Sequence, residues 1–405
     1  DNRWGYFPSI SFGWNVSREE FMGDNSNDLK IRADLGVTGN QDFGSYNALA
    51  TMGPFSDVYY YGTYYTGWAP NKNTNPNLKW EKAINWNIGV DFNLFSNRVN
   101  GSLNYYNRKQ QDLLGNYKVP VPPYLFDEMF VNVGTMKNTG LEIELRVDAV
   151  KTKDFSYNVG VVGATNQNKF VSFSNNEFEG QPYQDMCSMP SPGTPGYLQR
   201  LQEGERIGNF YTYAYAGVDE KGNWLIWNKD NTEKIAIGSA TSDDKRITGN
   251  GLPKFTASLN NTFVYKNWDL GLYFRGAFGF DIFDVHGFYY GLQSAASNAN
   301  VLKDAYSKHG NITTGMNVLT DYFIYKGDYI KLDVATLGYT LDLNSKWLDS
   351  IRLYGTVKNL FTITNFPGVD PATYQVNGLT PGTFGGSKNY YPSTTQFLIG
   401  VQLDF

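Results

Sequence analysis

The sequence contains very few of the residues that build disulfides, metal clusters or histidine-based active sites. Its 405 residues include one cysteine, Cys187, and two histidines, His286 and His309. A single cysteine excludes an internal disulfide and a cysteine-based metal cluster. Two histidines argue against a His-rich metal site. The acidic stretch at 228–233 lacks the glycine that a tight calcium loop needs, so we expect no metal and no cofactor.

Long apolar runs and basic blocks are also missing. No stretch of 18 or more apolar residues occurs, which excludes a transmembrane helix. The net charge is −5 and no Lys/Arg-rich block is present, which argues against nucleic acid as a partner. The chain begins at Asp1 without the basic and apolar regions of a signal peptide, so we expect any targeting signal to lie outside it.

The residues that are abundant favour β-structure. The chain has 30 Tyr, 27 Phe and 42 Gly, with 16% aromatic residues. Aromatic and β-branched residues fit pleated, half-buried surfaces. The clearest strand is 84–94, in which six apolar residues alternate with Asn85, Asn87, Gly89, Asp91 and Asn93: Ile84, Trp86, Ile88, Val90, Phe92 and Leu94. A helix would scatter these residues around its circumference.

The last eleven residues, Thr395 to Phe405, repeat this period of two. One face carries Phe397, Ile399, Val401, Leu403 and Phe405, and the other is mostly small or polar. A strand of about ten residues that is apolar on one face is long enough to cross an outer membrane. The strand 141–149 carries four charges on its second face, and such a row fits a water-filled lumen better than a dry core: Glu142, Glu144, Arg146 and Asp148.

The alternation predicts about eleven long strands, at 6–16, 29–38, 84–94, 98–110, 141–149, 155–167, 255–265, 268–280, 328–342, 351–361 and 395–405. Short turns (96–97, 151–154, 266–267, 343–350) alternate with long loops (39–79, 112–138, 170–252, 281–327, 362–392). This asymmetry is typical of outer-membrane barrels, whose long loops are extracellular. We therefore predict an all-β, transmembrane antiparallel barrel with a periplasmic carboxyl end. A soluble β-sandwich is less favoured because its strands are shorter.

This prediction assigns the two faces. We expect the lumen face to include Asn85, Asn87, Asp91, Glu142, Glu144, Arg146, Asp148 and Arg275, and the lipid face to include Ile84, Trp86, Ile88, Val90, Phe92, Phe397, Ile399, Val401 and Leu403. The lumen charges have two interpretations, packing of the wall against a plug or contact with substrate. Because bacterial barrels have an even number of strands, eleven strands indicate the carboxyl-terminal half of a larger barrel, or else a closed twelve-stranded pore with one strand overlooked.

Several stretches resemble the SusC/RagA-like family of TonB-dependent outer-membrane transporters from Bacteroidetes. They are Y-F-P-S-I-S-F-G-W-N-V-S at 6–17, L-K-I-R-A-D-L-G-V-T-G-N-Q at 29–41, N-P-N-L-K-W-E-K at 75–82, N-Y-Y-N-R-K at 104–109, V-G-T-M-K-N-T-G-L-E at 133–142, G-D-Y-I-K-L at 327–332, K-N-L-F-T-I-T at 358–364 and G-V-D-P at 368–371. They span nearly the whole chain in the order that the family shows.

The resemblance implies a 22-stranded barrel, of which residues 1–405 look like the last eleven strands, with the amino-terminal plug and strands absent from this sequence. It also implies a SusD-like lipoprotein lid, energy from the TonB complex through the plug, and import of oligosaccharides or peptides. A dimer of such pairs is compatible with it. The terminal Phe405 would then be the signal that the barrel assembly machinery reads.

Aromatic residues in the long loops are candidate substrate contacts, because flat rings stack on the apolar faces of sugars. They are Tyr59, Tyr60, Tyr61, Tyr64, Tyr65, Trp68, Trp224, Trp227, Tyr289 and Tyr290. The alternative is that they pack against other loops or a cap protein. Three functions stay open: an energy-coupled transporter, a self-contained passive porin or adhesin barrel, and a secreted carbohydrate-active enzyme. The acidic pairs Asp243/Asp244 and Glu142/Glu144 are weak candidates for a glycosidase pair, and we predict no catalytic residue.

Overall fold

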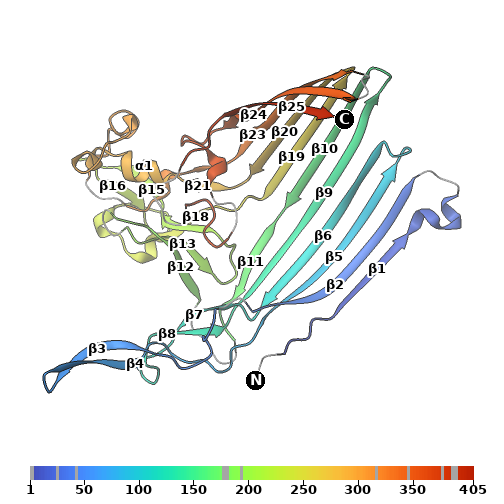
Figure 1. Cartoon of the computed structure of the whole chain (residues 1–405). Coiled ribbons are helices and arrows are strands. Elements are labelled where there is room, and N and C mark those ends of the chain that lie inside the picture. Colours follow the sequence, from blue (N-terminus) through green and yellow to red (C-terminus); the bar gives the residue numbers. More distant parts are fainter. Residues whose placement is uncertain are drawn as a thin grey trace.

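One large antiparallel sheet dominates the computed structural model, which describes residues 4–23, 27–41, 44–175, 182–191, 195–314, 318–343, 347–374, 378–384 and 391–405. Its strands run side by side in sequence order (Figure 1). They are β1 (Ser9–Asn15), β2 (Asp28–Asn40), β5 (Glu81–Leu94), β6 (Val99–Gln111), β9 (Thr135–Lys151), β10 (Phe155–Thr165), β19 (Phe255–Tyr265), β20 (Trp268–Phe278), β23 (Tyr329–Asp342), β24 (Ser350–Thr364) and β25 (Gln396–Asp404), and β11 (Gln167–Ser172) also pairs with β9.

These strands confirm the predicted all-β fold with about eleven long strands. Each predicted strand has its counterpart, and the prediction at 255–265 coincides with β19 (Phe255–Tyr265). The agreement follows from the period of two, which each strand needs in order to present different side chains on its two faces. The predicted long loops carry more structure than the sequence suggested, because they fold into hairpins and small sheets of their own.

The register places like with like across neighbouring strands. Val90 of β5 faces Leu103 of β6, which faces Ile143 of β9. One residue along, Asp91 lies opposite Ser102, which lies opposite Glu144. We name the side that carries Val90 the apolar face and the side that carries Asp91 the polar face. Every strand of the sheet contributes residues to both faces, because successive side chains point in opposite directions.

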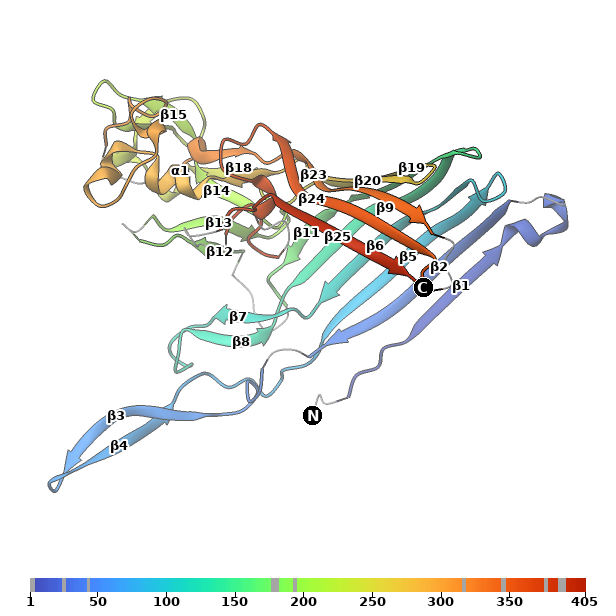
Figure 2. The ribbon, with the colours of Figure 1, turned by 45° about the horizontal axis from the view of Figure 1, so that its top comes forward.

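All long connections lie at one end of the strands and the short turns lie at the other (Figures 1 and 2). We call these ends the loop end and the turn end. The loop end contains β3 (Met52–Tyr60), β4 (Thr63–Pro70), β7 (Leu114–Lys118), β8 (Glu128–Asn132), β12 (Tyr183–Ser188), β13 (Tyr197–Gln202), β14 (Asn209–Tyr213), β15 (Tyr215–Val218), β16 (Trp224–Trp227), β17 (Lys234–Ala236), β18 (Lys245–Asn250), β21 (Asp281–Phe283) and β22 (Ile324–Lys326).

In the described ranges, helical structure is limited to one α-helix and short 3-10 turns. The α-helix is α1 (Val285–Tyr290), and the 3-10 turns are η1 (Val16–Arg18), η2 (Glu20–Met22), η3 (Ile237–Ser239), η4 (Ser242–Asp244), η5 (Gln293–Ser297), η6 (Lys303–Ala305), η7 (Asp321–Phe323) and η8 (Pro371–Thr373). Within the part of the chain that the structure describes, no helix has the length and apolar character needed to cross a membrane.

The loop-end elements pack onto the polar face of the sheet. Ala277 and Tyr329, which lie opposite each other on that face, form a buried cluster with Phe366 and Tyr374 from the last long loop. A second cluster joins Phe170 of β11 to residues of the 198–252 segment. The loops therefore close over the polar side at the loop end.

The apolar face has aromatic residues at both of its margins. On β20, Trp268 at the turn end contacts Tyr339, with ring centroids 4.7 Å apart, and Phe278 at the loop end stacks on Phe255. The eleven residues from Trp268 to Phe278 span about 34 Å along the strand, or about 26 Å of height at a strand tilt of about 40°. This height matches the apolar band of about 25 Å that outer-membrane barrels present to lipid.

The sheet is open. The pairing order begins with β1 and finishes with β25, and within the described ranges no strand pairing joins these two edges. An open edge leaves backbone groups without sheet partners, which lipid does not tolerate.

A glycine permits an ion pair that crosses three strands at the turn end. Arg352 of β24 donates to Asp269 of β20 at 2.6 Å, passing over Gly338 of the intervening strand β23. A Cβ atom on Gly338 would lie 2.4 Å from the Asp269 carboxylate and 2.7 Å from the Arg352 guanidinium. The small residue is therefore required by the ion pair above it.

We predict that Gly338→Ala displaces this ion pair and lowers stability by about 1–3 kcal/mol, as overpacking does. Gly271→Ala is the matched control, because Gly271 lies on the same face and a Cβ there meets nothing within 4 Å. The midpoint of heat unfolding, followed by the gel mobility of the full-length protein, should fall for Gly338→Ala only. Equal midpoints for the two variants would contradict this role of Gly338.

Candidate functional site

The polar face brings together the residues predicted to line the lumen. Pairing across six consecutive strands puts Asp91, Glu144 and Arg275 in one transverse row, through Ser102, Val162 and Ser258. The other predicted residues share this face in neighbouring rows: Asn85, Asn87, Glu142, Arg146 and Asp148. Their assignment to an aqueous lumen stays a prediction, but the structure makes them one continuous polar surface.

Side chains on this surface bond to one another across strands. Arg32 of β2 donates from Nε to the Asp91 carboxylate at 2.9 Å and from Nη2 to Asn104 Oδ1 at 2.5 Å. The guanidinium passes over Gly89, where a Cβ would lie 3.0 Å from its central carbon. The sequence alone did not identify Arg32, because an isolated arginine in a strand carries no sign of its partners.

The centre of the polar face is hollowed into a groove of about 440 Å³. Its lining is mostly hydrogen-bonding side chains, including Glu144, Arg146, Asn158, Asn260 and Tyr273. Such a surface offers hydrogen-bond donors and acceptors, and it carries both a negative and a positive side chain. It suits a hydrated, hydroxyl- or amide-rich solute better than an apolar one.

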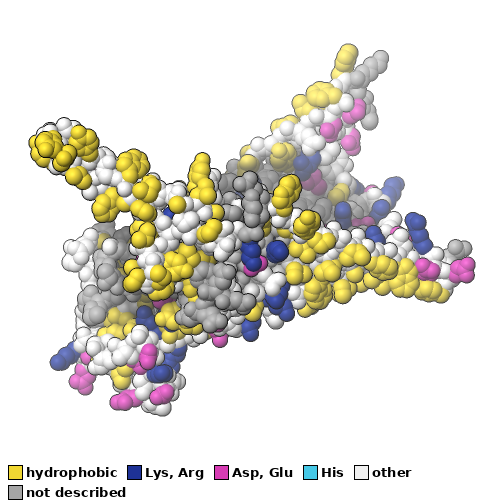
Figure 3. Space-filling view, turned by 90° about the horizontal axis from the view of Figure 1, so that it is seen from below, with side chains coloured by type: hydrophobic (Ala, Val, Ile, Leu, Met, Phe, Trp, Pro, Cys, Tyr) yellow, Lys and Arg dark blue, Asp and Glu magenta, His cyan; other side chains and the backbone are white. Residues whose placement is uncertain are grey.

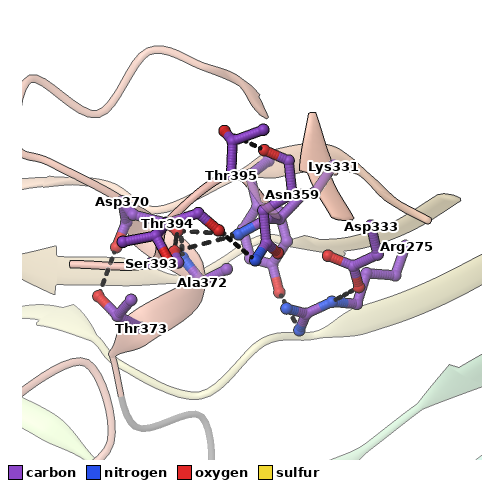
Figure 4. A network of polar contacts seen from close by, with 11 residues as sticks. Arg275, Lys331, Asp333, Asn359, Asp370, Ala372, Thr373, Ser393, Thr394 and Thr395 are labelled. Carbon is purple, nitrogen blue, oxygen red and sulfur yellow. Dashed lines mark hydrogen bonds and ion pairs between the residues drawn. The ribbon is translucent and has the colours of Figure 1, made fainter. Parts of the chain in front are cut away.

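A buried ion pair ties the last long loop to the sheet (Figure 4). The Lys331 Nζ of β23 donates to the Asp370 carboxylate at 2.9 Å, and the two side chains are only 3% and 9% exposed. Ser393 also donates to this carboxylate, and the Ala372 N–H donates to it at 2.9 Å. Burial raises the pKa of Asp370, but the bonds from Ser393 and Lys331 outweigh burial and lower that pKa below its usual value.

A second pair lies next to the first. The Arg275 Nε of β20 donates to the carboxylate of Asp333, which stands at a register shift in β23 (Figure 4). Arg275 also contacts the Tyr329 hydroxyl at 3.4 Å. The predicted lumen residue Arg275 is therefore part of the junction between the sheet wall and the loops above it.

The largest buried cluster lies in the loop-end elements, and it corrects two predicted binding residues. Trp224 is 0% exposed and Tyr289 is 2% exposed, and both belong to a core with Phe210, Phe288 and Phe323. Trp224 makes edge contacts with Tyr215 and Tyr322. Their prediction as substrate-stacking surfaces is wrong for this structure, because protein covers both faces of each ring. The cause is tertiary packing between segments distant in sequence.

Trp227 and Tyr290 are only half-buried. Trp227 lies under the Lys234 ammonium, 5.4 Å from the ring centre, and Tyr290 packs on the edge of the same core. Both stay available for contact with another molecule.

The six aromatic residues of the first long loop lie on one projecting hairpin, formed by β3 and β4 (Figure 2). Tyr59 and Tyr64 face each other with ring centroids 5.0 Å apart, and Tyr60 contacts Tyr61. All six are exposed, with values from 57% to 87% for Tyr59, Tyr60, Tyr61, Tyr64, Tyr65 and Trp68. Figure 3 shows these hydrophobic side chains covering an arm that extends away from the sheet. This hairpin is the clearest aromatic surface that the loop end offers to a partner.

Both histidines of the chain line one pocket that the sequence did not reveal. The pocket has a volume of about 670 Å³ and lies between α1, the 299–309 segment and residues 367–369. Its lining includes Asp284, His286, Asp304, Lys308 and His309. These residues are separated by up to 25 positions in loop sequence, so no local spacing could have identified them. The mixture of carboxylate, ammonium and imidazole groups can hold a small polar ligand.

Burial sets the protonation of this pocket. It lowers the pKa of His309, whose Nδ1 is 2.6 Å from the Tyr322 hydroxyl, so the neutral imidazole is favoured. Burial also raises the pKa of Asp284, although the Gly287 N–H donates to this carboxylate at 3.0 Å. Burial raises the pKa of Tyr325 to about 12.

The described residues show no group of three or more ligands arranged for a metal. At 228–233 the Asn228 side chain accepts the backbone N–H groups of Thr232 and Glu233, which makes the loop self-contained. The acidic pair Asp243/Asp244 is also held by neighbouring residues. The Asp244 carboxylate accepts hydrogen bonds from Thr241 in a capping box, and an Asp243 carboxylate oxygen lies 3.8 Å from the Lys229 ammonium nitrogen.

The residues predicted to face lipid lie together on the apolar face. They are Ile84, Trp86, Ile88, Val90 and Phe92 of β5 and Phe397, Ile399, Val401 and Leu403 of β25. Trp86 contacts Tyr105 with ring centroids 5.4 Å apart. Phe405 is exposed and lies at the turn end, where Figure 1 marks the carboxyl terminus.

Comparison with known proteins agrees with this architecture. A family model described as "TonB dependent receptor-like, beta-barrel" matches residues 1–360. The chain is 31% identical to TonB-dependent receptor P3 of Formosa agariphila and 29% identical to TonB-dependent receptor SusC of Bacteroides thetaiotaomicron, and it is covered completely in both alignments. It spans 42% and 40% of the length of these two relatives.

Solved structures resemble the fold. The RagAB peptide importer in its "open-open" state superposes with a TM-score of 0.77 at 23% identity, covering 100% of this chain and 43% of that one. At this level of identity the likeness concerns the fold alone.

We predict that Asp370→Leu destabilises the loop junction by about 3–5 kcal/mol, because it leaves the Lys331 ammonium buried without its counter-ion. The double variant Lys331→Met with Asp370→Leu should recover most of this loss. Limited proteolysis of the full-length protein measures the loss in the single variant and the recovery in the double variant. If the single variant resists protease as well as the double variant does, the ion pair does not hold the loop.

The Lys331–Asp370 pair also makes the stability of the protein depend on pH, and acid is expected to lower it. The folded pKa of Asp370 is lowered, so its stabilisation is complete above the unfolded pKa of 3.8 and is lost as pH falls through the folded value. The double variant should therefore lose less stability than the natural protein when pH drops below about 4.

Proposed function

The chain belongs to the family of TonB-dependent receptor-like β-barrels of the outer membrane, which is not a family of enzymes, and from this premise we propose that it forms part of the wall of an energy-coupled importer. The observation that carries the proposal is the continuous polar face, which runs through the sheet and is covered at one end by folded loops. An apolar band on the other face supplies the surface that lipid requires.

The orientation proposed is the one that the loop asymmetry predicts. The loop end faces the cell exterior, and the turn end, with Phe405, faces the periplasm. Phe405 then serves as the carboxyl-terminal assembly signal of the barrel. In this proposal the chain is the carboxyl-terminal part of one barrel domain. The chain spans about two fifths of the length of the two relatives, which supports a partial barrel.

The proposed substrate is an oligosaccharide or a peptide. The groove lined by Glu144, Arg146 and Asn260 supports this class, since its groups can exchange hydrogen bonds with hydroxyl or amide groups. The structurally similar RagAB protein is described as a peptide importer, which is consistent with the peptide alternative. Substrate would bind among the outer loops, and TonB acting on a plug would then open a path along the polar face.

A SusD-like lipoprotein lid is the proposed partner at the loop end, and a dimer of such pairs is compatible with it. The projecting hairpin supports a protein partner, because it exposes six aromatic rings and carries little charge. Its strands β3 and β4 contain one charged residue, Asp57. Tyrosine and tryptophan are enriched at protein interfaces. Stacking of the same rings on sugar is the competing use.

The competing function is a passive porin or adhesin barrel, and energy coupling separates the two. The test is uptake by cells that lack the gene, complemented with the full-length protein, on a panel of glycans and peptides. We predict uptake of one substrate class in complemented cells, and its loss when TonB is deleted or the proton gradient is collapsed. Uptake that continues without TonB would establish a passive pore and refute the proposal.

A further inference from the structure

Three lysines lie in register on neighbouring strands near the loop end. Lys109 of β6 is directly opposite Lys137 of β9, and Lys137 is directly opposite Lys169 of β11. The Cβ atoms of facing residues in such pairs are about 4.5–5.5 Å apart, and like charges at this distance are destabilising. All three side chains are exposed. The repulsion between these three ammonium groups destabilises the folded sheet unless an anion neutralises them.

The row belongs to the apolar face. Lys109 faces Ile84 of β5, two residues beyond Trp86, whose ring contacts Tyr105. Two residues of a strand correspond to about 7 Å. The lysines therefore follow the aromatic margin of the apolar band on the loop-end side, at the depth where lipid headgroups lie against a membrane barrel.

A pocket of about 680 Å³ opens beside the row. Lys137 and Lys169 line it on one side, Arg206 and Lys254 complete its cationic lining, and Glu205 is its one acidic residue. Phe255 lines its lower part, next to the stacked ring of Phe278. The pocket thus combines a cationic upper part with an aromatic margin below.

Among the described residues, the cations of this pocket have no ion-pair partner. In the described ranges, none of the four basic side chains forms an ion pair. The Arg206 Nη2 donates to the Leu252 carbonyl at 3.3 Å, and its buried Nε has no hydrogen-bond partner among the residues described. The whole chain carries a net charge of −5, so this positive group is a local feature and not part of a general basic surface.

We propose that this pocket binds a phosphate group of the outer-leaflet glycolipid, with the acyl chains of that lipid lying along the apolar face below Phe255. Phosphate oxygens accept charge-assisted hydrogen bonds from ammonium and guanidinium groups, and they would relieve the repulsion along the lysine row. The site rests on the proposed orientation in the outer membrane but is separate from the import path, because it lies on the opposite face of the sheet.

Binding of bis-phosphorylated lipid A to the delipidated full-length protein, followed by native mass spectrometry in detergent, tests the site. Lys137→Gln with Lys169→Gln should weaken binding by about tenfold or more, and Lys254→Gln should weaken it independently. The matched control is Lys151→Gln with Lys153→Gln, which removes the same charge at the turn end and should leave binding unchanged. The arginine pair K137R/K169R should retain it.

Two further probes identify the source of the phosphate. Dephosphorylated lipid A should bind at least about tenfold more weakly than the phosphorylated form, and inorganic pyrophosphate should bind weakly because it lacks acyl chains. Equal binding of the two lipids, equal binding by the K137Q/K169Q pair, or tight binding of pyrophosphate alone would overturn the proposal. Import is measured in the same variants, and the lysine substitutions should leave it intact. This measurement separates a failure of the lipid-binding proposal from a failure of the proposed transport function.

Discussion

The register of the sheet is the constraint on which the rest of the structure depends. Side chains alternate between the two faces, so a slip of one residue would exchange the faces of a strand. In the row formed by β5, β6 and β9, such a slip would move Asp91 and Glu144 to the side now occupied by Val90 and Ile143. Desolvating a carboxylate without a partner costs several kcal/mol, which makes the observed register strongly favoured.

The positions of particular side chains on the two faces follow from this constraint. On β20, aromatic residues lie at both margins of the apolar face, and on β6, β9 and β11 a row of lysines lies near the loop end of the same face. On the polar face the Arg352–Asp269 pair stands over Gly338 and the Arg32 guanidinium stands over Gly89, and the loop-end elements fold back onto the same side. The two faces are thus adapted to different surroundings along their whole length.

The strands could be predicted from the sequence, whereas the loops could not, and the reason is physical. The alternation of Ile84 to Leu94 is a local property, and it survives in β5 because each residue meets the same surroundings as its second neighbour. Trp224 and Tyr289 have no such pattern, since their burial comes from contacts with segments up to 100 residues away. The pocket that holds His286 and His309 likewise depends on how distant loops meet. The lysine row needed the strand register before its members could be placed side by side.

We propose that the polar face is wet and that the apolar face contacts lipid. Single cysteines placed in turn at positions 84–88 and 90–93 of β5, in a cysteine-free full-length protein in native outer membranes, test it with a water-soluble and a lipid-soluble thiol reagent. We predict that positions 85, 87, 91 and 93 react with the water-soluble reagent, whereas positions 84, 86, 88, 90 and 92 react with the lipid-soluble one. Uniform labelling along the strand, or the reverse alternation, would contradict the account.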